Sequence, residues 1–568
     1  MNWIEREVSG EALDALQAAG VERLMARLLA VRGVTPETLA FYFDPSLSNL
    51  ESPESIPGIS EAARAILDAV RAGRKVVVFG DYDCDGISAT AIIVRTLRAF
   101  NASVIAFLPD RMSEGYGMTA LSVSRLLSEH PDTGIVVTVD NGINSVEEVA
   151  FLKAKGIDVV VTDHHLPGES LPECIVVNPK VSAPEQFEGL CGAGVAFFLS
   201  NALVGKAREE GIYTGGKISP PLFVLAGLAT ITDVMPLCAQ NRVLVSAALK
   251  LFRSYAPIGL KELYLRAAKT GAEVVSVRDF SFGIGPRINA SGRMSNGYEA
   301  LGLLLADNVE EAREFARKVD EKNVERKSVE QKMFDDAVKQ LANGAAAQII
   351  ELPQGHKGVA GIVASRVLEH LVKAGGSPVP VAVVVGRHGS LRAPEGYNIC
   401  EALSKSAMAL ERFGGHALAG GFTVKEGGME RFREIFPAVC EAWRADFADE
   451  THGTSLIDAW VNTEDLSVEF VESLEKMAPF GEGNPEPRFA LRGVRFSEVK
   501  AIGEGRHLAL SLANSGGLRG VWWRNGDKVE YFRSNSASLF DVMFTASISN
   551  FGSERHVEFN ILDVKPKK

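Results

Sequence analysis

The sequence predicts an α/β protein with a mostly parallel sheet, a long connecting helix, a second and smaller α/β unit, and a C-terminal β-barrel of the OB type. Three patterns lead to this fold class. From Lys75 onward, short apolar runs alternate with segments of helical period, as in βα units. Residues 307–342 contain no Pro or Gly and many charges. From about 455 the chain changes to short strands separated by turns.

We divide the chain into five segments on these patterns. Residues 1–70 are predicted to be mostly helical, with Pro53 and Pro57 marking loops. The other segments are the first α/β domain at 71–306, the long helix at 307–342, the second α/β domain at 343–454 and the barrel at 455–568.

The first α/β domain is expected to hold five strands and at least five helices. Its apolar runs predict strands at 76–79, 104–108, 135–139, 159–161 and 175–177. The helical period predicts helices at 87–100, 118–128, 145–155, 195–207 and 222–229.

A single helix is the preferred interpretation of 307–342, since nothing in its middle breaks it. It would extend about 50 Å at 1.5 Å per residue. Asp307 and Glu310 resemble a capping box at its start. The alternative is a helical hairpin with a turn near Asn323.

The remaining elements follow the same two periods. Strands at 347–351 and 381–385, helices at 361–373 and 398–410, and a turn at Gly414-Gly415-His416 are expected in the second α/β domain. The barrel is expected to use strands at 488–496, 507–513, 518–523, 539–548 and 555–564.

Composition limits the classes of protein to consider. At 568 residues the chain needs two to four domains, and 46% hydrophobic with 23% charged residues is typical of globular proteins. The start of the chain lacks the basic and apolar regions of a signal peptide, and no apolar run approaches the ~18 residues of a membrane span. The six cysteines form no CxxC pair, which argues against a zinc site or a disulfide framework. We therefore expect a cytoplasmic protein that does not bind a membrane.

The net charge of −12 bears on whether the protein binds nucleic acid. Nucleic-acid-binding proteins usually carry a basic surface, and overall basicity is no argument for such binding here. An acidic total does not exclude a nucleic-acid partner either, because the field that matters is local to the binding groove.

A cluster of carboxylates follows the first predicted strand. Asp81, Asp83 and Asp85 come directly after a β-branched run that ends in Gly80, so they lie at the carboxyl end of a parallel strand, where open α/β sheets bind ligands. Three like charges so close repel one another, and a divalent cation with oxygen ligands compensates them best. A helix N-cap or a local turn is the alternative, and it explains one aspartate more readily than three.

Further possible metal ligands follow later apolar runs. Asp140 begins an Asp-Asn-Gly turn, Asp163-His164-His165 ends the next strand, and Asp233 ends an apolar helix-like run. Parallel strands bring their carboxyl ends to one edge, so Asp81–Asp85, Asp140 and Asp163–His165 are expected to converge. Aspartate oxygens with an imidazole suit two Mn²⁺ or Mg²⁺ ions. Two such ions activate a water and stabilise charge on a phosphoryl group, which predicts hydrolysis at phosphorus with the leaving group left open.

The ordered motifs DYDCDG, VDNG, TDHH and ITDV resemble those of the DHH phosphoesterase superfamily. Further motifs extend the resemblance over nearly the whole chain and bring it to the branch that degrades single-stranded DNA. These motifs are GPRINASGR at 285–293, His356 with GIVASR at 361–366, GGHA at 414–417 and PFGEGN at 479–484.

The resemblance implies an exonuclease that removes nucleotides from single-stranded DNA in the 5′→3′ direction, in DNA recombination, mismatch repair and other DNA repair. It implies a DHH-type first domain, a DHHA1-like second domain and an OB-type barrel. A monomer is expected, with single-strand-binding protein and a helicase as partners.

The resemblance also implies a role for each motif residue. Asp83 and Asp140, with Asp81 nearby, would hold one cation, and Asp85, Asp140, His164 and Asp233 the other. Asp163 and His165 would be catalytic, with His165 on the scissile phosphate. The residues expected to bind substrate are Arg111, Arg287, Asn289, Arg366, Arg392, Gly415 and His416. Of these, Arg111 and Arg392 are candidates for a 5′-terminal phosphate, with a salt bridge as the alternative for each arginine.

The chain departs from the family pattern at two positions. Phe79 stands where many relatives that hydrolyse small substrates have a metal-binding histidine, so Asp81 is expected to take that role. Ala393 stands where a hydroxyl residue is usual, which removes one expected phosphate contact.

Basic and aromatic residues gather in one part of the barrel segment: Arg519, Trp522, Trp523 and Arg524. Aromatic rings interleaved with basic groups suit single-strand binding by stacking and charge neutralisation. Trp522 and Trp523 are neighbours on a strand, so only one of them is expected to face outward.

Two other functions remain open at this stage. One is a DHH phosphodiesterase of short oligonucleotides, against which the extra barrel argues. The other is a catalytically inactive replication scaffold, against which the retained charge cluster argues, because such a cluster is costly without a metal.

Overall fold

The structure is a computed structural model that describes residues 2–216, 220–267, 275–374, 378–446, 454–515, 517–549 and 555–567. The chain divides into two compact units. One contains residues 51–235 and 239–452, and the other contains 1–50, 236–238 and 453–568. Each unit is described by itself below.

The larger unit is built around a five-stranded parallel sheet in the order β3-β2-β4-β5-β6. The strands are β2 (Lys75–Phe79), β3 (Val104–Phe107), β4 (Thr133–Val139), β5 (Asp158–Thr162) and β6 (Ile175–Val177). The chain goes from β2 to β3 on one side and then to β4 on the other, so the carboxyl ends of β2 and β4 flank a topological switch point. Ligand sites of open α/β sheets lie at such points.

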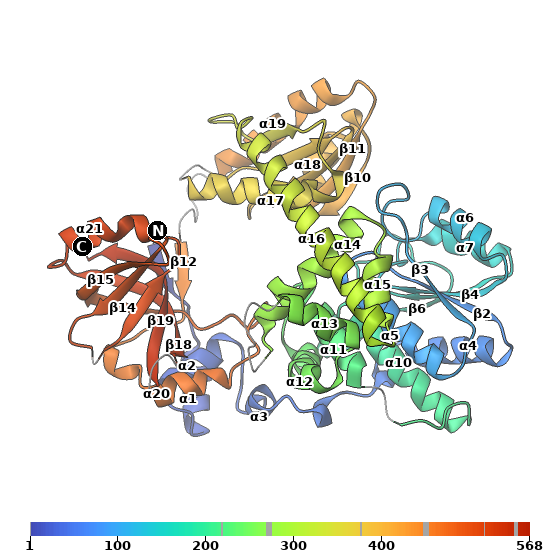
Figure 1. Cartoon of the computed structure of the whole chain (residues 1–568), viewed down its shortest axis with the longest axis horizontal. Coiled ribbons are helices and arrows are strands. Elements are labelled where there is room, and N and C mark those ends of the chain that lie inside the picture. Colours follow the sequence, from blue (N-terminus) through green and yellow to red (C-terminus); the bar gives the residue numbers. More distant parts are fainter. Residues whose placement is uncertain are drawn as a thin grey trace. The chain divides into compact units, whose positions relative to one another are not determined.

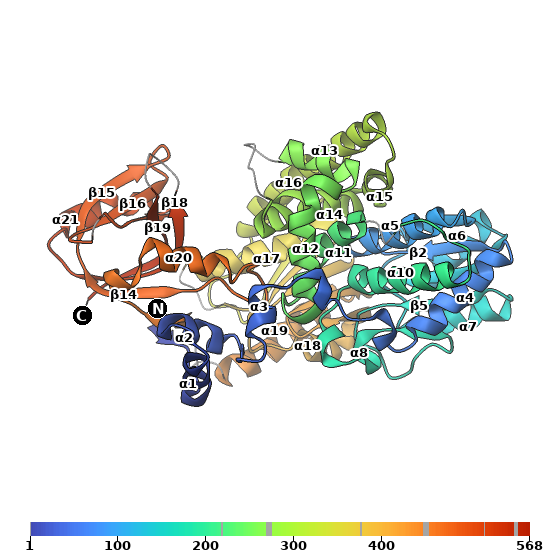
Figure 2. The ribbon, with the colours of Figure 1, turned by 90° about the horizontal axis from the view of Figure 1, so that it is seen from below.

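Helices cover both faces of this sheet (Figure 1). Helices α6 (Ala120–Glu129) and α7 (Val146–Ala154) pack on the face that carries Val77 and Phe79. On the other face lie α4 (Ile59–Arg71), α5 (Cys84–Ala99) and α10 (Gly192–Glu209), and in Figure 2 α4 and α10 lie in front of the sheet. Because both faces are buried, the strands are apolar throughout rather than alternating.

A helical layer connects this sheet to the long helix. Its helices are α8 (Pro179–Ser182), α9 (Glu185–Glu188), α11 (Pro220–Thr232), α12 (Ala239–Tyr255), α13 (Ile258–Ala267), α14 (Gly285–Met294) and α15 (Tyr298–Leu305), with a π-helical turn at Asp279–Ile284. The long helix α16 is continuous from Val309 to Val338, which confirms a single helix over a hairpin. Its N-cap is Asn308, whose side chain accepts from the Glu311 N–H at 2.9 Å, so the cap lies one residue after the predicted one.

The second sheet of this unit has the order β10-β11-β9-β8-β7. Its elements are β7 (Gln348–Glu351), α17 (Lys357–Lys373), β8 (Val381–Val385), β9 (His388–Arg392), α18 (Ile399–Lys405), β10 (Leu410–His416), β11 (Ala419–Val424) and α19 (Met429–Asp446). The predicted turn at Gly414-Gly415-His416 was wrong, because these residues form the end of β10 and pair with β11.

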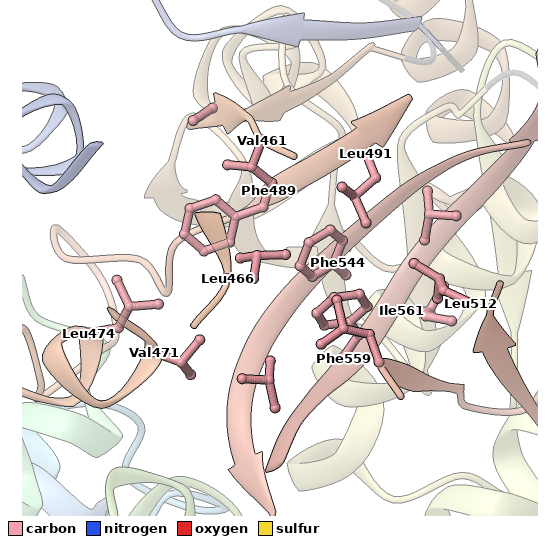
Figure 3. Close-up of a cluster of buried hydrophobic side chains, with 14 of the residues drawn as sticks. Val461, Leu466, Val471, Leu474, Phe489, Leu491, Leu512, Phe544, Phe559 and Ile561 are labelled. Carbon is pink, nitrogen blue, oxygen red and sulfur yellow. The ribbon is translucent and has the colours of Figure 1, made fainter. Parts of the chain in front are cut away.

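The smaller unit holds a seven-stranded mixed sheet in the order β13-β14-β18-β19-β17-β16-β15. Its strands are β13 (Ala459–Trp460), β14 (Phe489–Val494), β15 (Phe496–Ile502), β16 (His507–Leu512), β17 (Arg519–Trp522), β18 (Phe540–Ser549) and β19 (His556–Pro566), and its later helices are α20 (Val468–Glu475) and α21 (Val529–Ser534). Side chains from β14, β18, β19 and α20 point toward one another in its core, among them Phe489, Phe544, Phe559 and Ile561 (Figure 3).

The N-terminal segment packs into this same unit. Helices α1 (Gly10–Ala18), α2 (Arg23–Val31) and α3 (Leu39–Phe43) contribute Leu16, Leu28 and Tyr42, respectively, to the core of the sheet. Residues 2–5, predicted as part of a helical segment, form strand β1 (Asn2–Glu5), which pairs in parallel with β12 (Thr454–Ile457). This partner lies more than 400 residues away, so no local pattern announces the strand.

Among the described residues no single helix is long and apolar enough to cross a membrane. One pair, α12 with α13, reaches that length and composition only across a 94° bend. All six cysteines are free thiols.

Candidate metal centre

The three carboxylates after β2 are held by the turn into α5. Asp83 is the N-cap of α5, and its Oδ1 accepts from the N–H groups of Asp85 at 3.0 Å and Gly86 at 3.1 Å. Asp81 and Asp85 are 1% and 2% exposed. A Cβ at Gly86 would lie 2.6 Å from the Asp81 nitrogen, so glycine is required for the turn to close this tightly. A structural role as a helix N-cap therefore accounts for Asp83. It does not account for the burial of Asp81 and Asp85.

Asp85 is held by the start of α10. Its Oδ2 accepts from Gly192 N–H and its Oδ1 from Ala193 N–H, each at 2.7 Å. Both amides belong to the first turn of an 18-residue helix, where backbone N–H groups have no acceptor within the helix. The helix N-terminus also favours negative charge. The carboxylate is thereby fixed in orientation before any cation binds.

Asp140 follows β4 in a strained conformation. Its φ is +64°, a region that residues other than glycine rarely adopt, and asparagine or aspartate adopt it most readily. The Asn141 side chain stabilises the turn by donating to the carbonyls of Phe79 and Val139. A Cβ at Gly192 would lie 2.5 Å from the Asp140 Cβ, so α10 and this turn are in close contact. Such strain concentrates at functional sites.

The predicted ligands come together in three overlapping sets. Within each set one possible ligand atom per residue lies within 4.8 Å of the others. The sets are Asp81, Asp83 and Asp140; Asp85, His164 and Asp233; and Asp140, His164 and His165. Asp140 belongs to two sets, and its Oδ1 lies 3.1 Å from His164 Nε2.

The mutual repulsion of these carboxylates shows in their pKa values. Burial, and then the charge of neighbouring aspartates, raises the pKa of Asp81, Asp83 and Asp140 above the usual range. The same causes raise the pKa of Asp233 to about 8. Burial lowers the pKa of His164 to about 4, so this imidazole is neutral at pH 7 and can act as a ligand.

Hard divalent cations fit this set of donors. Asp81 Oδ1 and Asp140 Oδ1 are buried and have no hydrogen-bond partner among the described residues. Buried carboxylate oxygens without partners are costly unless an ion compensates them. Oxygen ligands with one or two imidazoles and no thiolate are the donors of Mn²⁺ and Mg²⁺ sites.

His165 is held differently from His164. Its Nδ1 lies 2.7 Å from Asp163 Oδ1. Asp163 also accepts from the backbone N–H groups of Ile143, His164 and His165. Burial alone would raise the pKa of Asp163, but these bonds, above all the one from His165, lower it. Burial disfavours the His165 cation, yet Asp163 outweighs this and raises the pKa of His165.

Tyr116 is a neighbour of this histidine that the motif analysis missed. Its hydroxyl oxygen lies 3.1 Å from His165 Nε2 and 3.2 Å from His165 Nδ1, and the hydroxyl donates to the Asp140 carbonyl at 3.2 Å. Tyr116 stands between Gly115 and Gly117, and this Gly-Tyr-Gly turn was a signal in the sequence that could have found it.

Three arginines converge beside the metal centre. Arg111 lies over the Tyr82 ring, 5.1 Å from its centroid. Burial, followed by the charge of Arg111, lowers the pKa of Arg392 below its usual range. Burial and then Arg111 lower the pKa of Arg293 to about 10, with Asp83 opposing and Arg392 among the other contributors. Arg293 lies within the motif GPRINASGR, but the sequence analysis assigned it no role.

Besides Arg392, whose Nη1 donates to the Leu391 carbonyl at 2.7 Å, three of the predicted substrate-binding residues have hydrogen-bond partners for their side chains within the protein. Arg287 donates to Asp320 on α16 at 2.8 Å and to the Gly283 carbonyl at 2.7 Å. Asn289 Oδ1 accepts from Cys84 N–H at 2.7 Å, which braces the turn into α5.

The third of these residues, Arg366 on α17, is paired with the long helix. Its Nη1 donates to Glu330 on α16 at 2.9 Å, and its guanidinium lies over the Phe334 ring. Gly415 and His416 are exposed at the end of β10. Gly415 has φ +142°, and a Cβ there would lie 2.4 Å from the Ala419 carbonyl oxygen.

The predicted single-strand platform lies in the smaller unit. Trp522 is 8% exposed and packs in the core of the sheet, whereas Trp523 is 55% exposed, so one tryptophan of the pair faces outward. Arg519 is paired with Glu558 at 3.3 Å. Arg524 is exposed, and its N–H donates to His507 Nδ1 at 3.0 Å.

Comparison with protein families identifies two segments. Residues 75–221 match the model of the DHH family, N-terminal domain, and residues 457–563 match the RecJ OB domain. The first match contains most of the metal-ligand candidates, and the second contains the tryptophan pair.

Curated relatives match almost the full chain. The chain is 37% identical over 487 residues to the single-stranded-DNA-specific exonuclease RecJ of Thermus thermophilus, covering 85% of this chain and 68% of that protein. It is 32% identical to the single-stranded-DNA-specific exonuclease RecJ of Escherichia coli, with 96% of each protein covered.

Solved structures agree with this. The crystal structure of RecJ from Thermus thermophilus in complex with Mn²⁺ has a TM-score of 0.84 and 30% identity, covering 100% of this chain and 80% of that one. The Mg²⁺ complex of the same protein has a TM-score of 0.78 and 29% identity, covering 100% of this chain and 79% of that one.

Proposed function

The chain belongs to the RecJ family of single-stranded-DNA-specific exonucleases, and we propose that it removes nucleotides from the 5′ end of single-stranded DNA with two divalent cations. The observation that carries the proposal is the sharing of Asp140 between two clusters of possible ligands. A role in DNA recombination and repair accompanies this activity.

The residues would divide between the two cations as follows. Asp83 and Asp140, with Asp81 beside them, hold one, and Asp85, Asp140, His164 and Asp233 hold the other. When bound, Mn²⁺ or Mg²⁺ supplies an activated water and neutralises charge at phosphorus. The carboxylates with raised pKa values give up their protons on binding, because a ligand oxygen must be deprotonated.

His165 is the group that faces the scissile phosphate. Asp163 holds its Nδ1 and raises its pKa, so the ring presents Nε2 as a hydrogen-bond donor or a cation. Such a preorganised donor stabilises the charge that develops on the phosphoryl oxygens.

The arginine cluster is the basis for the 5′ direction. Burial, and then the charge of Arg111, lowers the pKa values of Arg293 and Arg392, and a group with two negative charges relieves this repulsion. A 5′-terminal phosphate carries that charge, whereas an internal phosphodiester carries one. The guanidinium fork also matches phosphate oxygens in pairs. A strand end held there presents its first phosphodiester to the metal centre.

Digestion of end-labelled DNA tests the proposal. Single-stranded and double-stranded DNA and RNA, labelled at either end, are incubated with Mn²⁺, Mg²⁺ or a chelator. We expect mononucleotides or short products to be released from the 5′ end of single-stranded DNA, and no release with chelator. Release from the 3′ label first would contradict the direction, and equal cleavage of short RNA would favour a phosphodiesterase of short oligonucleotides.

The predictions of a monomer and of single-strand-binding protein and a helicase as partners stay open. So do the five predicted domain boundaries.

A further inference from the structure

The loop between β3 and α6 is shaped to present Tyr116. Gly115 and Gly117 on either side of it have φ +92° and +67°, which glycine adopts without the steric cost that a Cβ brings. The chain therefore turns sharply on both sides of Tyr116. This loop also carries Arg111.

Polar contacts brace the loop from both ends. Asp110 Oδ1 accepts from the N–H groups of Met112 and Ser113. The Glu114 carboxylate accepts from Arg125 of α6 at two points, from Nε at 2.6 Å and from Nη2 at 3.0 Å. The position of Tyr116 is therefore fixed by the protein before any substrate binds.

The hydroxyl of Tyr116 lies between two acceptors. It is 3.1 Å from His165 Nε2, 3.2 Å from His165 Nδ1 and 3.2 Å from the Asp140 carbonyl oxygen. Asp163 Oδ1 is the nearer partner of Nδ1, at 2.7 Å. With Nδ1–H directed at Asp163, the neutral ring has its lone pair on Nε2, and the tyrosine hydroxyl donates to it.

The same hydroxyl also suits the protonated ring. When Nε2 carries a proton, that N–H donates to the tyrosine oxygen, and the hydroxyl proton turns to the Asp140 carbonyl. Burial, followed by the charges of Asp140 and Asp81, raises the pKa of Tyr116 above its ordinary value, so the hydroxyl keeps its proton at neutral pH. His165 thus has a partner on each nitrogen until the phosphate takes the Nε2–H, and the tyrosine hydroxyl then keeps its bond to the Asp140 carbonyl.

We propose that Tyr116 is a positioning residue for His165, which it holds in the orientation required at the scissile phosphate. The inference rests on the proposed function, because it gives Tyr116 an effect only through the role of His165. It also places the histidine partner on the loop that carries Arg111, so one rigid segment serves both the strand end and the reacting phosphate.

Tyr116→Phe tests the proposal with little disturbance of packing. The ring, whose edge packs against Tyr82 with centroids 6.4 Å apart, is retained, and only the hydroxyl is removed. We expect kcat to fall about 3- to 10-fold, the value of one ordinary hydrogen bond, while KM and the affinity for a 5′-phosphorylated oligonucleotide stay unchanged. Tyr255→Phe is the matched control, because Tyr255 is half exposed at the end of α12, and its rate is expected to be unchanged.

A double-mutant cycle separates positioning from direct substrate contact. Single-turnover rates are measured with enzyme in excess for the wild type, Tyr116→Phe, His165→Ala and the double variant. We expect the double variant to be no slower than His165→Ala. A Tyr116→Phe loss of the same size in both backgrounds, a rise of KM alone, or an unchanged kcat would each overturn the inference. A full rate in His165→Ala would instead overturn the proposed role of His165.

A spectroscopic measurement reads the contact without turnover. In ¹⁵N-histidine-labelled protein with Mg²⁺, the His165 nitrogens are assigned by their loss in His165→Ala. We expect Tyr116→Phe to shift the Nε2 resonance of His165 and to leave the histidines outside the metal centre unchanged. An unchanged Nε2 resonance would show that the hydroxyl does not position the ring.

Discussion

At the scale of the residue, Asp140 combines backbone strain with buried charge. Its φ of +64° costs free energy, and its carboxylate is 2% exposed among other carboxylates. The cations that Asp140 would bridge explain why the fold keeps both its strained backbone and its buried carboxylate. Its position after β4 was predictable from the sequence, because a polar residue after an apolar strand marks the ligand edge of a parallel sheet. The left-handed conformation was not predictable.

Replacing this residue tests the bridge directly. Asp140→Asn keeps a residue that tolerates the left-handed region and removes the charge. We expect hydrolysis of single-stranded DNA to fall about 1,000-fold or more, because several kcal/mol of charge stabilisation at phosphorus is lost. Exonuclease assays and Mn²⁺ titration by calorimetry measure the effect. Asp158→Asn, at the exposed start of β5, is the control, and substantial turnover by a folded Asp140→Asn would contradict a shared ligand.

The raised carboxylate pKa values predict how stability depends on pH without metal. A carboxylate whose pKa is higher in the folded than in the unfolded chain holds its proton more tightly when folded. Its contribution is present at low pH and is lost as pH rises, for Asp233 between about 4 and about 8. We therefore expect the Tm of the chelator-treated protein to fall across this window.

Metal should oppose this loss. Added Mn²⁺ should raise the Tm more at pH 8 than at pH 6, because fewer protons must then be displaced. Thermal melts with chelator and with Mn²⁺ across the pH range measure both effects. A Tm increment from Mn²⁺ that is independent of pH would contradict the assignment of these carboxylates as ligands.

At the scale of the element, predictability followed the length and locality of the pattern. Helix α16 was predicted as one helix because 30 consecutive residues offer no break. Strands β9, β10 and β11 were missed, since Gly414, Gly415 and Gly420 lower strand propensity and the pairing of the hairpin, a tertiary feature, holds them. For the same reason the sequence did not show that Arg366 on α17 would pair with Glu330 on α16.

Strand β9 ends in Arg392, whose proposed partner is the 5′-phosphate. Arg392→Ala should lower kcat/KM about 10- to 100-fold on 5′-phosphorylated strands, the value of a charged hydrogen-bonded contact, and less on 5′-hydroxyl strands. Competition between the two strand types in one reaction measures the preference. Arg387→Ala is the control, because Arg387 is exposed between β8 and β9 and paired with Glu411. Equal losses on both strand types would make Arg392 a general strand contact.

At the scale of the whole molecule, no local pattern in the sequence indicates that the two ends of the chain fold together. The described residues of 2–50 and 454–567 share one core, in which Leu28 and Leu29 lie in the same cluster as Phe489 and Phe559. The apolar period of α2 shows that the helix has a buried face but not what covers it. The prediction that one of Trp522 and Trp523 faces outward is confirmed, because strand alternation is a local property.

Variants of the exposed neighbours Trp523 and Arg524 distinguish base stacking from phosphate neutralisation in the proposed strand platform. Binding is expected to depend on salt although the net charge is −12. Arg524→Ala should lower the slope of log K against log salt by about 0.7, the value for one phosphate of a single strand. Trp523→Ala should weaken binding by about 1–3 kcal/mol without changing that slope, because a stacked base releases no counterions. Arg519→Ala should change the slope less than Arg524→Ala, since Arg519 is already paired with Glu558. Titrations of a long oligonucleotide at several salt concentrations measure all three. Wild-type affinity and slope in both Trp523→Ala and Arg524→Ala would place the strand elsewhere on the molecule.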